Sequence, residues 1–400
     1  MGGVHVRSIA LIAIGVGCSA HAAAQDVDTV LVNGPPIWGS APRVVEELRI
    51  GTLMADPNES FGLIGGVLVL VDGSIWIGDR QLGAIRRFDA AGRYLGQVGQ
   101  EGEGPGEFKY PQGMRQLPSG DIAVWDDGQV RVSYFSPDGE FLRSFSPPTF
   151  MIGTPMEEFE LDQSTGELLL MSGNMPTAAR EDHRVFWLRL SGAGTVLDTV
   201  WVERTERDGL VDARATLTAL SPLGYRVLGR TDDYALILET SAAQRTVLVR
   251  PWTPVPYQRG ERQEKQRLAE LFSERNGQPP GRIAETKPAF SRIQVDETGR
   301  IWVSTYTEGI FAEESEGERS RREGSCEFFG ATKDECDRGI RQWREEAVFE
   351  VLGPGGDFYG RIALPSPQAE VVASRGDLFW VVESGGLGEQ YVVQYRVAGN

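Results

Sequence analysis

The sequence between Phe61 and Phe145 contains one pattern twice, and this internal repeat constrains the fold more than any other feature. In each copy an apolar stretch follows a glycine turn, ends at an aspartate and leads through a phenylalanine to a second glycine turn. Four landmarks recur at an offset of 47 residues: Gly73 and Gly120, Asp79 and Asp126, Phe88 and Phe135, and Gly92 and Gly139. A common offset at four separate points indicates repeated structural units.

Within the first copy, short apolar segments of strand length alternate with glycine turns. Residues 65–71 and 74–77 flank an Asp-Gly turn, and residues 84–88 and 94–98 flank an Ala-Gly turn. Asp-Gly between two apolar runs is a strong β-hairpin signal. Four short antiparallel strands in about 40–50 residues are typical of one β-propeller blade.

The pattern continues with less regularity toward the C-terminus. Further blades are predicted at about 113–145, 159–202, 225–250, 290–362 and 369–397. The last blade has only three strands of its own, and a propeller must close or leave strand edges bare. We therefore predict that Val44–Ile50 supplies the missing strand. The expected fold is all-β, a single six-bladed β-propeller over residues 43–400 that follows an extended lead-in at 25–42.

Two insertions are expected in this propeller. A charged segment at about 258–278 has apolar residues spaced as on one face of a helix. In the fifth blade 57 residues separate Gly299 from Gly356, whereas 19 separate Gly73 from Gly92 in the first blade. The excess predicts an insertion at about 307–346 that contains a short helix and two cysteines.

The N-terminal residues predict export. Residues 1–24 contain a basic residue, an apolar run too short to cross a bilayer, and small residues suited to cleavage. We therefore expect a periplasmic or extracellular protein, with a lipoprotein attached through Cys18 as the alternative. In an oxidising compartment, Cys326 and Cys336 are expected to form a disulfide.

The charge of the chain restricts its partners. There are 57 acidic and 40 basic side chains, a formal net charge of −17, which repels a phosphate backbone and anionic lipid surfaces. We therefore expect no nucleic acid partner, and after residue 24 no segment is apolar for long enough to span a membrane. A monomer that binds a protein or a small molecule is the expected state.

Several features resemble the NHL-type six-bladed β-propellers found in exported bacterial proteins. These are the Asp-Gly turn before Ile75–Asp79, Phe88 before the second glycine turn, and the glycine-rich link at 99–108. The resemblance extends over about residues 44–398. It implies the six-bladed fold but no single activity, because many unrelated functions share this architecture.

Large aromatic side chains follow the glycine turns at a constant distance. Trp76, Trp302 and Phe379 each stand three residues after a turn glycine. We expect them to pack between neighbouring blades, where flat side chains fill the space between twisted sheets. A platform for stacking carbohydrate is the functional alternative.

Carboxylates end the second strand of three blades, at Asp79, Asp126 and Glu383. An aspartate at such a place can begin the next turn by accepting backbone hydrogen bonds. The three are also candidate ligands for calcium, which binds about six to eight oxygen atoms. Calcium is the one metal that these carboxylates suggest, and no other cofactor is expected.

Cationic and aromatic residues near the predicted channel are the candidate ligand-binding residues. Arg115 and Arg292 lie in first strands, and Tyr110 and Lys287 lie in the loops that lead into them. The arginines can pair with carboxylates of neighbouring blades, or they can line a pocket for an anionic group.

No residue is assigned a catalytic role. Beyond residue 24, His183 is the only histidine, and no Gly-x-Ser-x-Gly motif is present, so a Ser-His-Asp triad has little support. We expect a binding or scaffold module that recognises a protein or small ligand at one end of its channel. The alternatives are a calcium-dependent hydrolase or lyase, similar to lactonases, that uses channel carboxylates, and a structural component of a cell-envelope assembly.

Overall fold

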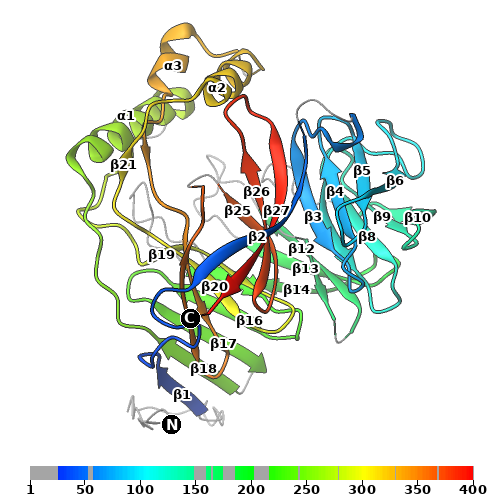
Figure 1. Cartoon of the computed structure of the whole chain (residues 1–400), viewed down its shortest axis with the longest axis horizontal. Helices are drawn as coiled ribbons and strands as arrows, with labels where there is room; N and C mark the ends of the chain where they lie inside the picture. Colours follow the sequence, from blue (N-terminus) through cyan, green and yellow to red (C-terminus); the bar gives the residue numbers. More distant parts are fainter. Residues whose placement is uncertain are drawn as a thin grey trace, which may run out of the picture.

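The structure is a computed structural model that describes residues 26–399, apart from 53–56, 148–158, 164, 174–184, 202–215, 242–243, 278, 329 and 367–368. The predicted export segment, with Cys18, and His183 lie outside the described residues. Six sheets of at least four strands follow one another around a ring (Figure 1). This arrangement confirms the predicted six-bladed β-propeller.

In each blade, four strands, or three in the last blade, pair antiparallel in chain order from the channel outward. The first three blades contain β3 (Ile64–Val69), β4 (Ile75–Asp79), β5 (Ala84–Phe88) and β6 (Tyr94–Val98); β7 (Pro111–Gln116), β8 (Ile122–Asp126), β9 (Arg131–Phe135) and β10 (Phe141–Phe145); and β11 (Phe159–Asp162), β12 (Glu167–Gly173), β13 (Val185–Leu190) and β14 (Val196–Trp201). A single 3₁₀ turn, Pro57–Glu59, precedes the first blade.

The other three blades differ more in the length of their connections and in their number of strands. They contain β15 (Thr216–Leu220), β16 (Arg226–Arg230), β17 (Ala235–Ser241) and β18 (Gln244–Val249); β19 (Phe290–Val295), β20 (Ile301–Thr305), β23 (Val348–Leu352) and β24 (Phe358–Ala363); and β25 (Glu370–Arg375), β26 (Leu378–Ser384) and β27 (Gln390–Ala398). The strand β15 had no clear signal in the sequence.

Aromatic side chains fill the spaces between the blades, as predicted. Trp76 and Trp302 are almost completely buried, and both lie in second strands. The ring of Trp302 in blade 5 lies 5.4 Å from the ring of Phe379 in blade 6. Second strands are covered on both faces by neighbouring blades. Their sequences are therefore continuous apolar runs, such as Ile-Trp-Ile in β4.

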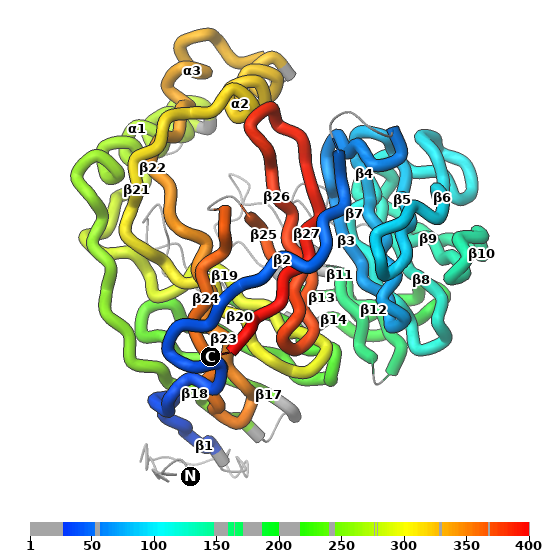
Figure 2. The backbone as a smooth tube through the Cα atoms, viewed as in Figure 1, coloured from blue at the N-terminus to red at the C-terminus, as the bar shows by residue number. Residues whose placement is uncertain are grey.

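The N-terminal strand β2 (Arg43–Ile50) closes the ring. It pairs antiparallel with β27, with Val44 opposite Val397, and is the outermost strand of blade 6. The two ends of the propeller therefore share one sheet, and their tubes run side by side (Figure 2). This confirms the predicted closure.

The segment before β2 is more than an extended lead-in. Strand β1 (Asp26–Leu31) adds to blade 4 in parallel with β18. Farther along, the N–H groups of Ile37 and Trp38 donate to the carbonyls of Phe358 and Tyr359 in β24, at 2.9 and 2.8 Å. The segment thus covers the outer edges of blades 4 and 5.

The two insertions contain helices. The first is α1 (Arg259–Asn276), and the second contains β21 (Ile310–Phe311), α2 (Glu316–Phe328), α3 (Lys333–Arg338) and β22 (Trp343–Arg344). We call these five elements the cap. Helix α1 agrees with the expected helical insertion, whereas the second insertion contains two helices, α2 and α3, where one short helix was expected. No helix in the described part of the chain is long and apolar enough to cross a membrane.

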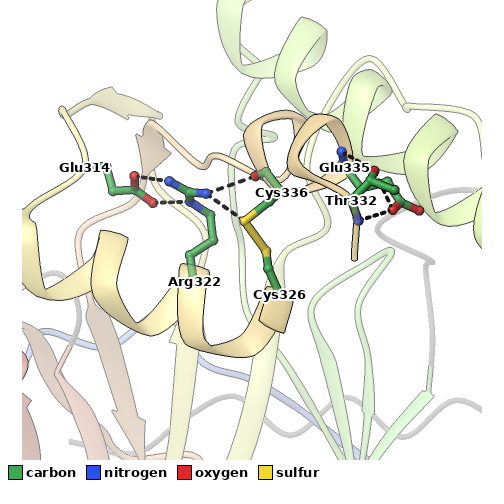
Figure 3. The surroundings of a disulfide bond; sticks show 6 residues. All are labelled: Glu314, Arg322, Cys326, Thr332, Glu335 and Cys336. Atoms are coloured by element: carbon green, nitrogen blue, oxygen red, sulfur yellow. Dashed lines mark hydrogen bonds and ion pairs between the residues drawn. A yellow bond between two sulfur atoms is a disulfide. The ribbon is translucent and has the colours of Figure 1, made fainter. Parts of the chain in front are cut away.

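The predicted disulfide between Cys326 and Cys336 is present, with 5.8 Å between the Cα atoms. It joins the last turn of α2 to α3 (Figure 3). The Arg322 side chain donates to the carbonyl oxygen of Cys336 and to its Sγ, and Glu314 holds the same guanidinium through two hydrogen bonds. Covalent and ionic links therefore fix this part of the cap.

Replacing Trp38 tests how strongly the N-terminal segment holds the ring. Trp38 is only 5% exposed, and its Nε1 donates to Asp377 at 3.0 Å. Trp38→Ala should lower the free energy of unfolding by about 3–5 kcal/mol, because a large buried side chain is lost. Urea unfolding measures this change. Ile37→Ala, at an exposed neighbour, is the control and should change stability by no more than about 0.5 kcal/mol; equal losses would contradict the assignment.

Candidate functional site: the insertion end of the propeller

Both insertions leave the propeller at the same end. In an antiparallel four-stranded blade, the turn between the second and third strands lies at the end where the chain crosses to the next blade. Helix α1 lies in the crossing from β18 to β19, and the rest of the cap lies between β20 and β23. Figure 1 shows α1, α2 and α3 together above this end, which we call the insertion end.

A buried lysine ties the cap to blade 5. The Lys287 side chain is completely buried, and its Nζ lies 2.7 Å from Glu261 Oε1 and 2.9 Å from Glu345 Oε1. It also donates to the carbonyl of Thr307 at 2.7 Å. Glu261 belongs to the first turn of α1, and Glu345 follows β22. One cation thus fixes both insertions.

This cluster places two carboxylates around one ammonium group. Burial is the main cause that raises the pKa of Glu345, and the charge of Glu261 raises it further. Hydrogen bonds from the Thr307 N–H and from Lys287 act in the opposite direction without reversing the shift. The desolvation cost therefore exceeds the benefit of pairing at Glu345.

Helix α1 holds the rest of the cap through its polar side chains. Glu264 accepts hydrogen bonds from the N–H groups of Gln342 at 2.7 Å and Trp343 at 3.3 Å. The N–H of Gly317 in α2 donates to the carbonyl of Gly386 at 2.9 Å. The cap is therefore attached to blade 6 as well as to blade 5.

Asp79 acts as a backbone anchor. One of its oxygens accepts from the N–H groups of Gln81 and Leu82, at 3.0 and 3.1 Å, in the turn that follows β4. The other accepts from the Gly62 N–H, at 3.2 Å, in the loop that precedes β3. The carboxylate therefore joins the loop before the first strand to the end of the second strand.

Asp126 joins the loop before the first strand to the end of the second strand in blade 2. Its oxygens accept from the N–H groups of Lys109 at 2.8 Å and Tyr110 at 2.9 Å, and from Gln129 Nε2 at 2.7 Å. Both aspartates thus begin turns by accepting backbone hydrogen bonds, as the structural interpretation predicted.

The third candidate metal ligand has different partners. Glu383 accepts from the Tyr395 hydroxyl at 2.8 Å and pairs with Arg49 at 3.0 Å. Across the described ranges, no group of three or more His, Cys, Asp or Glu side chains is placed to hold a metal ion. Asp79, Asp126 and Glu383 are therefore not brought together into one cluster, and calcium binding stays a prediction.

The two candidate arginines pair across neighbouring blades. Arg115 on β7 binds Glu160 on β11, with Nε 2.9 Å from Oε2, and Arg292 on β19 pairs with Glu370 on β25. In each case the partners lie on the inner strands of consecutive blades. This is the structural role that the sequence analysis offered as the alternative to a ligand pocket.

The four candidate ligand-binding residues belong to two opposite parts of the ring. Tyr110 and Arg115 lie in blade 2, and Lys287 and Arg292 lie in blade 5. Lys287 is buried by the cap, whereas the Tyr110 ring is exposed at the insertion end, with the Arg80 guanidinium 5.3 Å from its centre. Their role in ligand binding stays a prediction, and Tyr110 is the member best placed for it.

Sequence reasoning missed a set of exposed apolar side chains at the insertion end. All are between 39% and 65% exposed, and we call them the apolar rim: Leu63, Leu82, Tyr110, Ile310, Phe311 and Leu387. At the opposite end the turns of the described residues expose two large apolar side chains, Val71 and Leu223. The sequence signal that could have predicted this exposure is a leucine beside turn glycines, as in Gly386-Leu387-Gly388.

Removing the buried cation should destabilise the protein strongly. Lys287→Met leaves Glu261 and Glu345 buried without a counter-charge, so the free energy of unfolding should fall by about 3–5 kcal/mol. Urea unfolding followed by tryptophan fluorescence measures the loss. Arg292→Met, which breaks the exposed pair with Glu370, is the matched control and should cost about 0–1 kcal/mol. Equal losses for the two variants would show that the cluster does not hold the cap.

The raised pKa of Glu345 predicts a pH dependence of stability. Between the ordinary carboxyl pKa of 4.5 and the higher folded value, the native state binds more protons than the unfolded state. Wild-type stability should therefore fall, relative to Glu345→Gln, as pH rises through that window. Urea unfolding of both proteins from about pH 4.5 to 8 tests this. Parallel stability curves would contradict it.

Comparison with known proteins confirms the fold. Residues 59–163, which include the first two blades, match the DUF5128 family, described as a 6-bladed beta-propeller. A member of the DUF4221 family from Bacteroides vulgatus is similar at 10% identity and a TM-score of 0.51, over 90% of this chain and 99% of that chain.

Two further solved structures are less similar. A Bacteroides fragilis protein described as exported has 12% identity and a TM-score of 0.49, over 88% of this chain and 95% of that chain. An inactive virginiamycin B lyase from Staphylococcus aureus has 11% identity and a TM-score of 0.40, over 85% of this chain and 82% of that chain. No curated protein matches the sequence. The family match and the DUF4221 structure support a six-bladed propeller and indicate no particular activity.

Proposed function

We propose that this chain is an exported, NHL-type propeller that binds a protein or small ligand at its insertion end without catalysing a reaction. The observation that carries the proposal is the apolar rim, six exposed apolar side chains at the end where the cap stands, from blades 1, 2 and 6 and from the cap. Several exposed apolar side chains at one end of a protein mark an interaction site more often than a single one does.

The way the cap is held supports a recognition role. It is fixed to blade 5 by Lys287, to blade 6 by the Gly317 backbone, and internally by the disulfide. A surface that is already ordered loses little conformational entropy when a partner binds. Ile310 and Phe311 of the cap are therefore presented to a partner in a fixed position, with Phe311 packed edge-on against Trp343.

The cysteines and the N-terminal sequence support the proposed location. A disulfide persists in the periplasm or outside the cell, where thiols are oxidised. Residues 1–24 have the pattern of an export signal. Both features support an exported protein.

The contacts of the carboxylates favour binding over a calcium-dependent hydrolase. The carboxylate oxygens of Asp79 and Asp126 already accept several hydrogen bonds, mostly from backbone N–H groups, and these compete with calcium for the same lone pairs. The rim, in contrast, has large side chains that already face solvent. A binding role therefore needs no rearrangement of the blades.

Capture experiments with matched variants test the proposal. Immobilised protein is incubated with envelope extract, and bound proteins and small molecules are identified by mass spectrometry. Phe311→Arg with Leu387→Arg should weaken retention of a specific partner by more than about tenfold, because apolar contact residues are lost. Val71→Arg with Leu223→Arg, at the opposite end, is the control and should retain the partner.

Two results would contradict the proposal. The first is a partner that both double variants retain equally, which places its site elsewhere. The second is a saturable rise of the unfolding midpoint with millimolar calcium, which would favour the hydrolase, since a ligand at about 100 times its dissociation constant adds roughly 2.7 kcal/mol to stability.

A further inference from the structure

The outer strands of four blades contain the same β-bulge. In blade 1, Phe88 pairs with Tyr94 and Arg87 pairs with Gly96, so Leu95 has no partner in the ladder. The same shift leaves one residue unpaired in three other blades: Leu142, Leu197 and Tyr359. Each of the four follows a turn glycine by three residues. A bulge turns the extra side chain away from its regular position in the strand.

The bulged residues differ in what covers them. Leu95, Leu142 and Leu197, in blades 1–3, are between 47% and 53% exposed. Tyr359, in blade 5, is partly buried, with its ring 5.6 Å from the ring of Trp38. The chain thus covers the bulge with its own N-terminal segment in blade 5 and leaves the bulges of blades 1–3 open.

The covered bulge shows what kind of segment fits this position. The N–H groups of Ile37 and Trp38 donate to the carbonyls of Phe358 and Tyr359 at the edge of β24. The Trp38 side chain lies between blades 5 and 6, against Gly360 and in one apolar cluster with Ile362 and Phe379. An extended segment therefore pairs with the edge and places an aromatic side chain between two blades.

The outer edge of β10, where blade 2 faces blade 3, pairs with no added strand among the described residues. Beside this edge lies a hollow of about 430 Å³ lined by Arg143, Ser144 and Phe145 of β10 and by Gly192 and Ala193 of the β13–β14 turn. Arg143–Phe145 follow Leu142 as Gly360–Ile362 follow Tyr359. We call this hollow, together with the outer edge of β10, the outer cleft.

An arginine bridges each of the first two gaps between blades. The Arg87 side chain donates to the carbonyl of Pro137 at 3.2 Å, and its guanidinium also lies beside Gly139 and Gly96. From blade 2, Arg143 makes the equivalent contact: its guanidinium lies 3.6 Å from the centre of the Tyr134 ring and donates to the Gly192 carbonyl. The hollow lies beside this guanidinium.

We propose that the outer cleft binds an extended segment of a partner protein, with backbone pairing to β10 and an aromatic side chain in the hollow. Strand addition at a sheet edge supplies affinity through main-chain hydrogen bonds, and a side-chain pocket supplies specificity. Strand β1, which pairs with β18 over six residues, is a second example of an outer edge that accepts an added strand. This surface is distinct from the apolar rim, so its role does not depend on that of the insertion end.

A peptide of residues 33–41 is the probe, because it carries Ile37 and Trp38 in their native sequence. The labelled peptide is titrated into the mature protein, whose own segment already occupies blade 5, and fluorescence polarisation reports binding. Saturable binding below about 1 mM is expected. Ala193→Trp, which fills the hollow, and Leu142→Arg should each weaken it by at least about tenfold. A peptide with alanine in place of its tryptophan should lose affinity similarly.

Leu95→Arg is the matched control, since it changes the equivalent bulge in blade 1, and it should leave binding unchanged. The unfolding midpoint of each variant shows that the fold is kept, and Leu142→Arg, at an exposed position, provides the test if Ala193→Trp does not fold. Absence of saturable binding overturns the proposal. Binding that is unchanged in both Ala193→Trp and Leu142→Arg also overturns the proposal. The peptide would then bind by displacing the chain's own segment from blade 5. Self-association of wild-type protein that Ala193→Trp abolishes would assign the cleft to a second copy instead.

Discussion

The ring depends on the pairing of β2 with β27, because this ladder places the segment that leads into blade 1 in the sheet of the last blade. The seven residue pairs of this ladder connect strands that lie at opposite ends of the sequence. Blades 1, 2, 3 and 5 pair their own strands in chain order, whereas blade 4 also takes up β1 from the N-terminal segment. Of the two non-local pairings, that of β2 with β27 is the one that joins the two ends of the propeller.

The cap and the N-terminal segment use the closed ring in different ways. The cap relies on a buried ion cluster, in which the geometry around Lys287 has to satisfy two carboxylates at once. Such a cluster contributes more to a unique position than to net stability. The N-terminal segment relies on backbone pairing and on Trp38. The cap stands over the insertion end beside blades 5 and 6, and the N-terminal segment pairs with the outer edges of blades 4 and 5.

The fold could be predicted because the signals for a propeller are local and repeated. Glycine turns, the Ile-Trp-Ile strand and the common offset each depend on residues close in sequence, and the closing strand followed from counting strands. The site could not be predicted as well. Whether Arg115 and Lys287 face a ligand or a carboxylate depends on Glu160, Glu261 and Glu345, which are distant in sequence. The fit of Trp38 between blades 5 and 6 has no periodic signal at all.

The bulges at Leu95, Leu142 and Leu197 also bear on solubility. An outer strand with a regular ladder of free N–H and C=O groups is a template for uncontrolled pairing with other chains. A bulge interrupts that ladder and increases the local twist, so a flat strand cannot continue along it. The exposed wall of blades 1–3 is therefore protected from indiscriminate aggregation by the same irregularity that sets which segments can pair with it.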